Sequence, residues 1–500
     1  MKKLLVGGLW QPEISEVIMK VLFVGSECVP FIKTGGLADV MGALPKALSS
    51  DDCDVRVILP FYSCIPEKFR SKAKFITSFD MDLGNFPRRF YVGILGMKLD
   101  GIQYYFIDNQ DFFNQGNPYT TIANDIGRYT FFDKAVLAAL PVIDFLPDVI
   151  HCHDWQAALV PVYLRTLFKD TPVAKAKTVM TIHNLRFQGN NETAVVKGIT
   201  GLPDYVFNYD GICHGRDANM LKGGIVFSDM VTTVSRTYAD EIKTHEYGEQ
   251  LEGVTSYYSR KLRGIVNGID TEVYNPSSDK HIFKTYTART IVSGKKANKL
   301  GIQKELGLVQ DEKKFVIALI SRLTDQKGLD LVNAIMHNVL DEHTQFILIG
   351  TGEPQYEGFF RNLENTHKGQ VSANIMYSDD RAHKVFAAAD AMLVPSCFEP
   401  CGLTQLMAMR YGTLPIVRET GGLKDTVEPY NEYSESGTGF SFDRYDAGLL
   451  LDCINYAKTV YFTRRDSWNK MVKRAMGKDF SWNASAQTYL DMYREVIDMY

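Results

Sequence analysis

The chain has 500 residues, of which 45% are hydrophobic and 23% charged, and its formal net charge is −4. This length exceeds one ordinary domain and suits two of roughly 200–250 residues each. The charge excludes a global basic field of the kind that binds nucleic acid or an anionic membrane, and no apolar run reaches the roughly 18 residues of a membrane span. The eight cysteines do not form CxxC pairs, which favours reduced thiols and a cytoplasmic protein.

The first residues resemble a signal peptide only superficially. Residues 1–3 are MKK and a short apolar run follows at 4–10, but QPE at 11–13 interrupts it without an A-x-A cleavage pattern. Met19 opens a second start that runs directly into a first strand. We therefore expect residues 1–18 to be an extension outside the fold, and translation from Met1 or from Met19 stays open.

Short apolar runs alternate with helix-period segments along the whole chain. In the first half we expect strands at 21–25, 55–59, 104–107, 149–153, 178–182 and 230–234, with helices such as 37–48 and 131–142. In the second half we expect strands at 315–320, 346–349, 375–377, 392–395 and 414–417, with helices including 328–340, 383–389 and 403–411. The alternation indicates two doubly wound α/β domains with parallel sheets covered on both faces.

The domain boundary is predicted in the stretch GIVNGID at 264–270. Glycine and asparagine allow positive φ there, and Asn275-Pro276 begins irregular chain. We predict an N-terminal domain at 19–265, a C-terminal domain at 266–480 and a closing amphipathic helix at 481–500.

The segment KTGGLAD at 33–39 follows the first strand and opens a helix. Gly35 and Gly36 permit close backbone approach, the helix N-terminus favours anions and Lys33 adds a mobile cation. This predicts a phosphate-facing loop, with a plain strand–helix turn as the alternative. The segment is neither a P-loop nor a dinucleotide fingerprint.

The segment SRLTDQKG at 321–328 follows the first strand of the second half. Arg322 offers bidentate geometry to phosphate and Lys327 offers a point charge. The alternative is a surface turn that contains charges, but an arginine directly after a buried strand favours a functional role.

A carboxylate, Glu399, precedes another predicted helix in the stretch FEPCGLTQ. It could accept sugar hydroxyls or stabilise positive charge at an anomeric carbon, while the N–H groups of Leu403 and Thr404 could hold a phosphate. Taken alone, Glu399 is better explained as a helix-capping acid. A second Gly-Gly turn at 420–422 makes four such strand-to-helix junctions, which together predict one cleft that holds a diphosphate.

Three groups of residues suggest metal sites, and we favour a structural explanation for each. In HCHDW at 151–155, residues 151 and 153 share one face of a strand, so we expect them to be packed or hydrogen-bonded. Cys397 and Cys401 lack nearby partner ligands. Asp52 and Asp54 form a D-x-D string, but they precede a strand, which is typical of a solvated turn.

Together these segments resemble the bacterial glycogen synthase and plant starch synthase family, from about Met19 to the C-terminus. The matching stretches are KTGGLADV (33–40), HCHDWQAAL (151–159), TIHNLRFQG (181–189), LKGGIVFSD (221–229), TTVSRTYADEI (232–242), GIVNGIDTEVYNP (264–276), SRLTDQKGLD (321–330) and FEPCGLTQLMAMRYGTLPIVRETGGLKDTV (398–427). The last stretch is the most specific. One departure is Gln250 in EYGEQLEG, where the family usually has Gly, which bears on the backbone of that loop.

The resemblance implies a GT-B fold, in which two Rossmann-like doubly wound domains face a cleft and the C-terminal helix crosses back to the first domain. It implies transfer of glucose from ADP-glucose to the non-reducing end of an α-1,4-glucan such as glycogen or a maltooligosaccharide, with retention of configuration and without a metal or other cofactor. A synthase that uses UDP-glucose, and a non-catalytic glucan or nucleotide-sugar sensor, are the alternatives. A glucan phosphorylase lacks support, since no cofactor-lysine signature is recognisable.

The same resemblance implies roles for single residues. Arg322 and Lys327 bind the diphosphate and stabilise the leaving group, Lys33 and Gly36 reach it from the opposite domain, and Tyr377 stacks on the adenine. The implied catalytic set is Glu399, His183, Asp154, Arg322 and Lys327. The implied substrate-binding set is Lys33, Gly35, Gly36, Asp39, Asn184, Tyr377, Cys401, Gly402, Leu403, Thr404, Thr420, Gly421 and Gly422.

Overall fold

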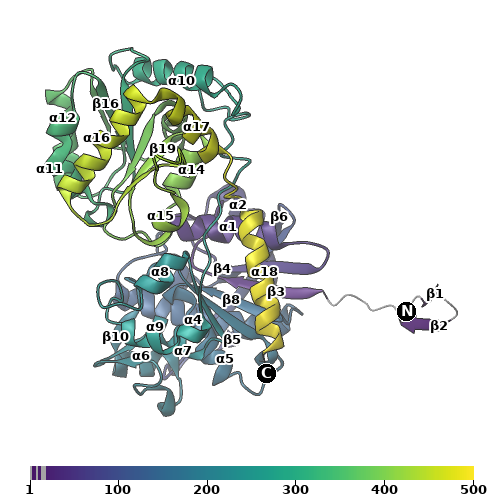
Figure 1. The fold of residues 1–500 in the computed structure, drawn as a ribbon. Helices are drawn as coiled ribbons and strands as arrows, with labels where there is room; N and C mark the ends of the chain where they lie inside the picture. Colours follow the sequence, from purple (N-terminus) through teal and green to yellow (C-terminus); the bar gives the residue numbers. More distant parts are fainter. Residues whose placement is uncertain (1–2, 7–8, 13–17, 500) are drawn as a thin grey trace. The chain divides into compact units, whose positions relative to one another are not determined.

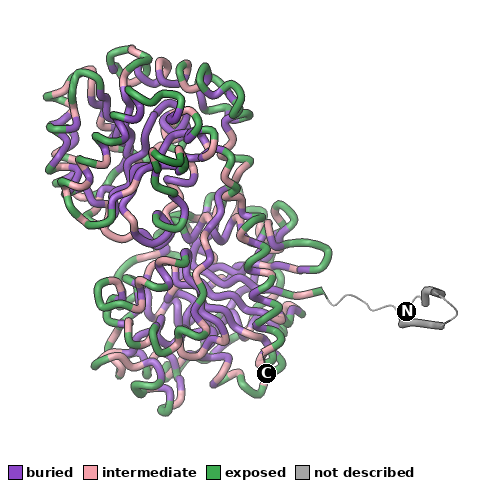
Figure 2. The backbone as a smooth tube through the Cα atoms, in the orientation of Figure 1, coloured by how far each residue is buried: buried purple, intermediate pink, exposed green. Residues whose placement is uncertain are grey.

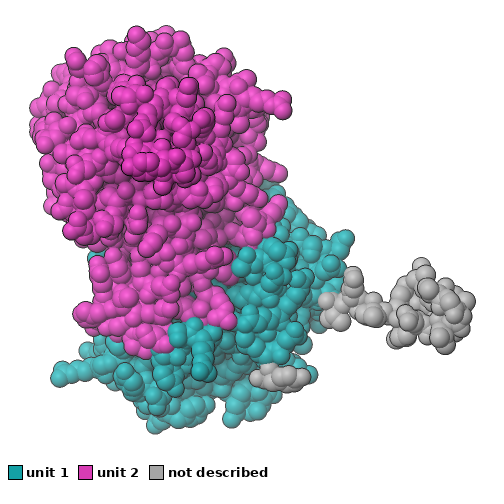
Figure 3. Space-filling model, viewed as in Figure 1, with its two compact units in different colours: residues 1–232, 257–261, 486–500 teal, residues 233–256, 262–485 magenta. Residues whose placement is uncertain are grey.

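A computed structural model describes residues 3–6, 9–12 and 18–499 of the chain. The chain forms two compact units (Figure 3). Unit 1 consists of residues 1–232, 257–261 and 486–500, and unit 2 of residues 233–256 and 262–485. In each unit helices flank a central sheet (Figure 1), and the buried backbone follows the strands (Figure 2).

The sheet of unit 1 has the strand order β13-β9-β8-β3-β4-β7-β6-β5. Neighbours from β9 to β7 are parallel, whereas β6 pairs antiparallel with β7 and with β5. The strands are β3 (Met19–Val24), β4 (Cys53–Pro60), β5 (Lys74–Met81), β6 (Phe90–Leu99), β7 (Ile102–Asp108), β8 (Val149–His153), β9 (Lys177–Ile182) and β13 (Met230–Thr233). Parallel strands buried on both faces explain the continuous apolar runs in the sequence.

Helices and a small second sheet complete unit 1. The helices are α1 (Gly36–Leu48), α2 (Glu67–Arg70), α3 (Gln110–Phe113), α4 (Ile122–Val142), α5 (Leu159–Arg165), α6 (Thr193–Thr200) and α7 (Met220–Phe227). The second sheet has the order β10 (Asn190–Glu192), β12 (Asp217–Asn219), β11 (Cys213–His214). Two helices run across a unit limit, α9 (Glu252–Tyr257) and α18 (Trp482–Asp498).

The sheet of unit 2 has the order β17-β16-β15-β18-β19-β20, and all neighbours are parallel. Its strands are β15 (Phe315–Ile320), β16 (Thr344–Ile349), β17 (Val371–Asn374), β18 (Ala391–Val394), β19 (Leu414–Arg418) and β20 (Phe440–Phe442). Its helices are α8 (Arg236–Glu241), α10 (Ile291–Glu305), α11 (Leu329–Val339), α12 (Pro354–Thr366), α13 (Asp379–Ala388), α14 (Thr404–Arg410), α15 (Gly421–Thr426), α16 (Ala447–Thr463) and α17 (Arg465–Met476).

Both sheets have the same doubly wound topology. Counted along the chain from β15, the strands of unit 2 lie in the order 3-2-1-4-5-6, and those of unit 1 counted from β3 lie in that order too, with β6 and β5 added at the edge. The order reverses between β15 and β18 in unit 2 and between β3 and β8 in unit 1. In open α/β sheets, ligands bind beyond the carboxyl ends of the strands at such a switch point.

The prediction of two doubly wound units is confirmed, and most predicted strands lie within two residues of the observed ones. The strand expected at 375–377 is wrong, because β17 ends at Asn374, whose side-chain amide donates to the carbonyl of Leu348 at 3.0 Å. Helix α4 begins nine residues before the expected start at 131, since a buried ion pair between Arg128 and Asp125 interrupts the apolar pattern.

The unit limits differ from the predicted boundary at 265, because residues 233–256 and 262–265 belong to unit 2. In the first of these segments, Asp425 accepts from the backbone N–H groups of Arg236 and Thr237. Of the predicted extension 1–18, the structure describes 3–6, 9–12 and 18, and residues 3–6 pair antiparallel with 9–12 as β1 and β2. The rest of that extension lies outside the described residues.

The loop that contains Gln250 has unusual backbone angles. Glu249 has a φ of 48° and Gln250 a φ of 71°, both in the left-handed region that favours glycine. The departure from the family's usual glycine therefore leaves the loop with two consecutive left-handed residues that carry side chains.

In the described part of the chain, the helices are too short or too polar to cross a bilayer.

Gly328 offers a test of the packing at the unit 2 switch point. It has a φ of 70°, and a Cβ there would lie 2.1 Å from the carbonyl oxygen of Pro395. We expect Gly328→Ala to lower the free energy of unfolding of unit 2 by about 2 kcal/mol or more, from left-handed strain and overpacking. Urea unfolding followed by circular dichroism measures this change.

Gly358 provides the matched control, because it lies exposed in α12 and a Cβ there would meet nothing within 4 Å. We expect Gly358→Ala to stabilise the protein by about 0.5–1 kcal/mol. Equal effects of the two substitutions would contradict the packing argument.

Candidate active site

An ion pair lies at the switch point of unit 2. The Lys327 Nζ is 2.7 Å from Glu399 Oε2, and the Ser396 hydroxyl donates to the same oxygen at 2.8 Å. Glu399 is 7% exposed, so this carboxylate is largely removed from water. Lys327 ends a short 3₁₀ turn (Asp325–Lys327) after β15, and Glu399 lies in the loop after β18. The order of the sheet thus brings together two residues 72 positions apart.

Backbone contacts fix these two loops to each other. The Cys397 backbone N–H donates to the Gln326 carbonyl at 2.8 Å. The side-chain amide of Gln326 donates to the Phe398 carbonyl at 3.2 Å. Gly328 packs directly against the Pro395 carbonyl, as described above. The ion pair therefore joins side chains whose backbones are already held in place.

Arg322 lies exposed at the same edge of the sheet. Within the part of the chain that the structure describes, its guanidinium has no hydrogen bond or ion pair. A guanidinium in this position retains its full fork of donors for an anion.

The capping alternative for Glu399 does not hold in this structure. Helix α14 has Leu403 as its N-cap residue and no side-chain cap. The carboxylate of Glu399 instead bonds to Lys327 and Ser396. Among the described residues, the N–H groups of Leu403 and Thr404 donate to no acceptor.

The glycines at 421 and 422 are required by packing inside unit 2. A Cβ at Gly421 would lie 2.0 Å from the Glu399 carbonyl oxygen, and one at Gly422 would lie 2.1 Å from that of Cys401. The Gly421 N–H donates to Glu241 Oε1 at 3.0 Å, and the Thr420 hydroxyl donates to the same oxygen at 2.9 Å. Two of the predicted substrate-binding residues are thus hydrogen-bonded to a carboxylate of α8.

The remaining predicted residues of unit 2 have distinct surroundings. Cys401 is buried, which raises the pKa of its thiol to about 12 and leaves it protonated. Gly402 has a φ of 72° and turns the chain into α14. Tyr377 follows β17 and is 73% exposed, with its hydroxyl 2.8 Å from Asp379 Oδ1.

The loop at the unit 1 switch point is built on a buried carboxylate. Glu27 lies after β3 and accepts from the Thr34 and Tyr119 hydroxyls, both at 3.0 Å, and from the Gly35 N–H at 3.3 Å. Burial raises the pKa of Glu27. Side-chain atoms at Gly35 or Gly36 would meet nothing within 4 Å. This loop therefore has open space above its glycines.

Lys33 and Asp39 form an exposed ion pair beside these glycines. The Lys33 Nζ is 2.8 Å from Asp39 Oδ1, and their side chains are 38% and 27% exposed. A pair this open to solvent contributes little to stability. Lys33 can therefore exchange its carboxylate partner for a ligand phosphate at small cost.

Asp154 and His183 meet on the other side of the same switch point. Asp154 directly follows β8 with a φ of 57°, a strained value for a residue with a side chain. Its Oδ1 accepts from the His183 N–H at 2.7 Å. Burial raises the pKa of Asp154 to about 7 and lowers that of His183 to about 3. Asn184, the next residue, is half-buried and its Oδ1 accepts from the Arg186 N–H at 3.1 Å.

The histidines of HCHDW are hydrogen-bonded as predicted. His151 Nδ1 is 2.6 Å from the Tyr493 hydroxyl in α18, and its Nε2 contacts Thr181. His153 Nδ1 is 3.0 Å from His183 Nε2. In the residues that the structure describes, no cluster of three or more His, Cys, Asp or Glu could hold a metal ion. Asp54 pairs with Arg56 at 2.8 Å.

Sequence reasoning missed three positions that shape these sites. Glu27 could have been found as the first acid after the first strand. Glu241 and Arg418 carry no such signal, because their roles depend on the tertiary structure. Arg418 is buried and donates to the Ser396 carbonyl at 3.0 Å and to the Tyr247 hydroxyl at 2.9 Å.

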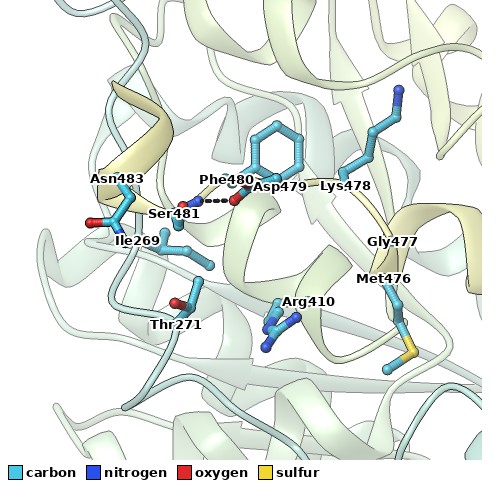
Figure 4. A pocket seen from close by; sticks show the side chains of 10 residues that line it. All are labelled: Ile269, Thr271, Arg410, Met476, Gly477, Lys478, Asp479, Phe480, Ser481 and Asn483. Carbon is cyan, nitrogen blue, oxygen red and sulfur yellow. Dashed lines mark hydrogen bonds between the residues drawn. The ribbon is translucent and has the colours of Figure 1, made fainter. Parts of the chain in front are cut away.

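A pocket of about 490 Å³ in unit 2 lies apart from the predicted residues (Figure 4). Its lining includes Arg410, Lys478 and Phe480, and it contains none of the residues discussed above. The pKa of Asp479 is lowered mainly by hydrogen bonds from Ser481, and the charge of Arg410 lowers it further. The pocket therefore has mixed charge.

Residues 20–257 match the family model of the starch synthase catalytic domain, and residues 304–474 match that of the glycosyl transferases group 1. A glycogen synthase of Lachnospira eligens is 54% identical over 477 residues, which cover 95% of this chain and 99% of that protein. One of Lachnoclostridium phytofermentans is 51% identical over 478 residues, 95% of this chain and 100% of that protein. The chain belongs to the glycogen synthase family.

Solved structures agree with this assignment. The catalytic domain of starch synthase IV from Arabidopsis thaliana, bound to ADP and acarbose, has a TM-score of 0.87 and 32% identity, and the match covers 96% of this chain and 100% of that one. Sucrose-phosphate synthase from Thermosynechococcus elongatus has a TM-score of 0.61 at 16% identity, over 96% and 99% of the two chains, which shows a common fold. The chain is a glycosyltransferase with the two Rossmann-like domains of the GT-B fold.

The raised pKa of Asp154 predicts a pH dependence of stability. The folded state holds this proton up to about pH 7, whereas the reference value is 3.8. Stability from this group is fully present below the unfolded pKa and is lost as pH rises through about 7. We expect the free energy of unfolding of Asp154→Asn, relative to the unsubstituted enzyme, to rise from pH 5 to pH 8.

Urea unfolding of both proteins at the two pH values measures this difference. Lost hydrogen bonds in the variant shift both values equally, so the change with pH isolates the titration. Parallel pH profiles would show that Asp154 ionises normally.

Proposed function

We propose that the enzyme transfers glucose from ADP-glucose to the non-reducing end of an α-1,4-glucan with retention of configuration. The observation that carries this proposal is the Lys327–Glu399 pair, 2.7 Å apart at the switch point of unit 2, with the exposed Arg322 at the same edge of the sheet. The glycogen synthases among the relatives and the ADP in the starch synthase structure support it.

Departure of ADP develops negative charge on its phosphates, and the cations of unit 2 suit that charge. The Arg322 guanidinium can bind two phosphate oxygens in a bidentate manner, and the Lys327 ammonium can bind a phosphate as a point charge. In the free enzyme the Lys327 ammonium is held by Glu399, so it is fixed in place before the donor arrives. The N–H groups of Leu403 and Thr404 add two neutral donors.

Glu399 suits a stabilising role rather than that of an attacking nucleophile. The side chain is 10% exposed, and its carboxylate is already bonded to Lys327 and Ser396, which spreads its charge. In the step we propose, the bond from the anomeric carbon to the leaving phosphate breaks. The bond to the acceptor oxygen forms on the same face, and the acceptor proton passes to a phosphate oxygen. While the first bond is broken and the second is not yet complete, Glu399 stabilises the positive charge at the anomeric centre.

We propose that the residues of unit 1 act on the same substrate. Lys33 can bind phosphate once it releases Asp39, and the open space at Gly35 and Gly36 permits backbone approach. His183 is neutral at physiological pH, because burial holds its pKa at about 3. It therefore contributes hydrogen bonds to sugar hydroxyls instead of a charge.

A donor comparison tests the activity. With a glycogen primer and radiolabelled sugar nucleotides, we expect incorporation from ADP-glucose at a kcat/KM at least tenfold above that from UDP-glucose. Because we propose that Arg322, Lys327 and Lys33 act in place of a metal, we expect the rate to be unchanged after dialysis against EDTA. Preference for UDP-glucose would favour the alternative donor, and no incorporation from either would favour a sensor.

The ion pair gives a second test with a matched control. We expect Lys327→Ala and Glu399→Ala each to lower kcat by about 10²–10³-fold, the range for loss of one preorganised electrostatic group. Lys304→Ala removes an exposed lysine of α10 and should leave kcat within twofold. Full activity of both Lys327→Ala and Glu399→Ala would contradict the proposal that this ion pair lies in the active site.

A further inference from the structure

The three histidines near the carboxyl ends of β8 and β9 differ in how their ring nitrogens are used. His151 uses both nitrogens, one on Tyr493 and one on Thr181. His153 uses only Nδ1, which lies 3.0 Å from His183 Nε2. The Nε2 of His153 is buried and has no hydrogen-bond partner among the described residues. This single unpartnered atom decides which way the hydrogen bond between the two rings runs.

Both rings are neutral, because burial lowers the pKa of His153 well below its usual value and that of His183 to about 3. Each ring therefore carries one N–H, and there are two arrangements. In the first, His153 donates from Nδ1 and leaves an unpaired acceptor at its buried Nε2. In the second, His183 donates from Nε2, and His153 must then keep an unpaired N–H at that same buried position.

The first arrangement is the more stable. Orphaned buried N–H groups are rarer in proteins than under-satisfied acceptors, and an unsatisfied donor in a buried site carries its full desolvation penalty. Movement of the His153 ring is also restricted, since it packs against Phe23 and His151, with centroid distances of 5.2 and 4.2 Å. His153 is thus held as a fixed donor towards His183.

The consequence appears at the other nitrogen of His183. A neutral ring that accepts at Nε2 carries its proton on Nδ1. In the described structure this Nδ1 has no hydrogen-bond partner, and the side chain is half-buried. It is therefore free to donate to a ligand oxygen.

We propose that His153 is a positioning residue: its Nδ1–H donates to His183 Nε2 and holds His183 in the Nδ1–H form, which donates to a hydroxyl oxygen of the transferred glucose. The proposal rests on the function proposed above, in which His183 contacts the sugar. It adds that the direction of this hydrogen bond is set by a residue that does not touch the substrate.

Two substitutions at one position separate hydrogen bonding from packing. His153→Asn keeps an N–H donor near the place of Nδ1, whereas His153→Leu fills the space without a donor. We expect Leu to lower kcat/KM for ADP-glucose by about 10–100-fold, the range for loss of a supporting hydrogen bond, and Asn to recover most of it. Thr232→Val removes a buried hydroxyl bonded to Thr181 in the same region; it should lower stability and leave kcat/KM unchanged.

Nitrogen NMR of the full-length enzyme with ¹⁵N-labelled histidine reads the tautomer directly. We expect the His183 signals, assigned with His183→Gln, to show a protonated Nδ1 and an unprotonated Nε2, and to change to a tautomer mixture in His153→Leu. A protonated Nε2 on His183, or equal losses for Asn and Leu, would overturn the proposal. If His183→Gln itself keeps full activity, the proposed function fails instead, since His183 then does not act on the sugar.

Discussion

The site in unit 2 depends on the close backbone approach of three loops that leave neighbouring strands. The loops after β15, β18 and β19 meet through Gly328, Gly421 and Gly422, where a carbonyl oxygen occupies the place of each missing side chain. These contacts bring the backbone of 395–401 near 326–328 and 421–422. Lys327 and Glu399 then form their ion pair without ordering flexible backbone, so the remaining entropic penalty is that of fixing the two side chains.

The same constraint changes the meaning of the second Gly-Gly turn. From the sequence, Thr420, Gly421 and Gly422 looked like a ligand-binding loop. In the structure, the two glycines allow the turn to pack on 399–401, and Glu241 accepts from its N–H and hydroxyl groups. Through these contacts the turn helps to fix the position of Glu399. Contact with substrate stays a prediction for these residues.

The fold could be predicted from the sequence because buried parallel strands produce continuous apolar runs and the loops after them carry unusual residues. Lys33, Arg322 and Glu399 were predicted as site residues in this way, whereas Asp154 was predicted only from the family resemblance. The antiparallel strands β5 and β6 were not, since exposed residues such as Phe75 break the pattern. Partners distant in the sequence, such as Glu241 for Gly421, were also beyond reach, because only the tertiary structure brings them together.

The two units use different electrostatics, and the proposed reaction gives a reason. Unit 2 presents charges, Arg322 and the Lys327–Glu399 pair, that suit a leaving diphosphate and a positive anomeric centre. Around β8 and β9, burial reduces the charge of groups in unit 1. The pKa of His183 is about 3, so its ring is neutral, and that of Asp154 is about 7, so its carboxyl group is partly protonated near neutral pH. Sugar hydroxyls are uncharged, and a buried charge against them would be poorly compensated. A neutral histidine can either donate to a hydroxyl or accept from it, depending on which ring nitrogen carries the proton. Because the buried Nε2 of His153 sets that proton position in His183, it affects a substrate contact that His153 itself does not make.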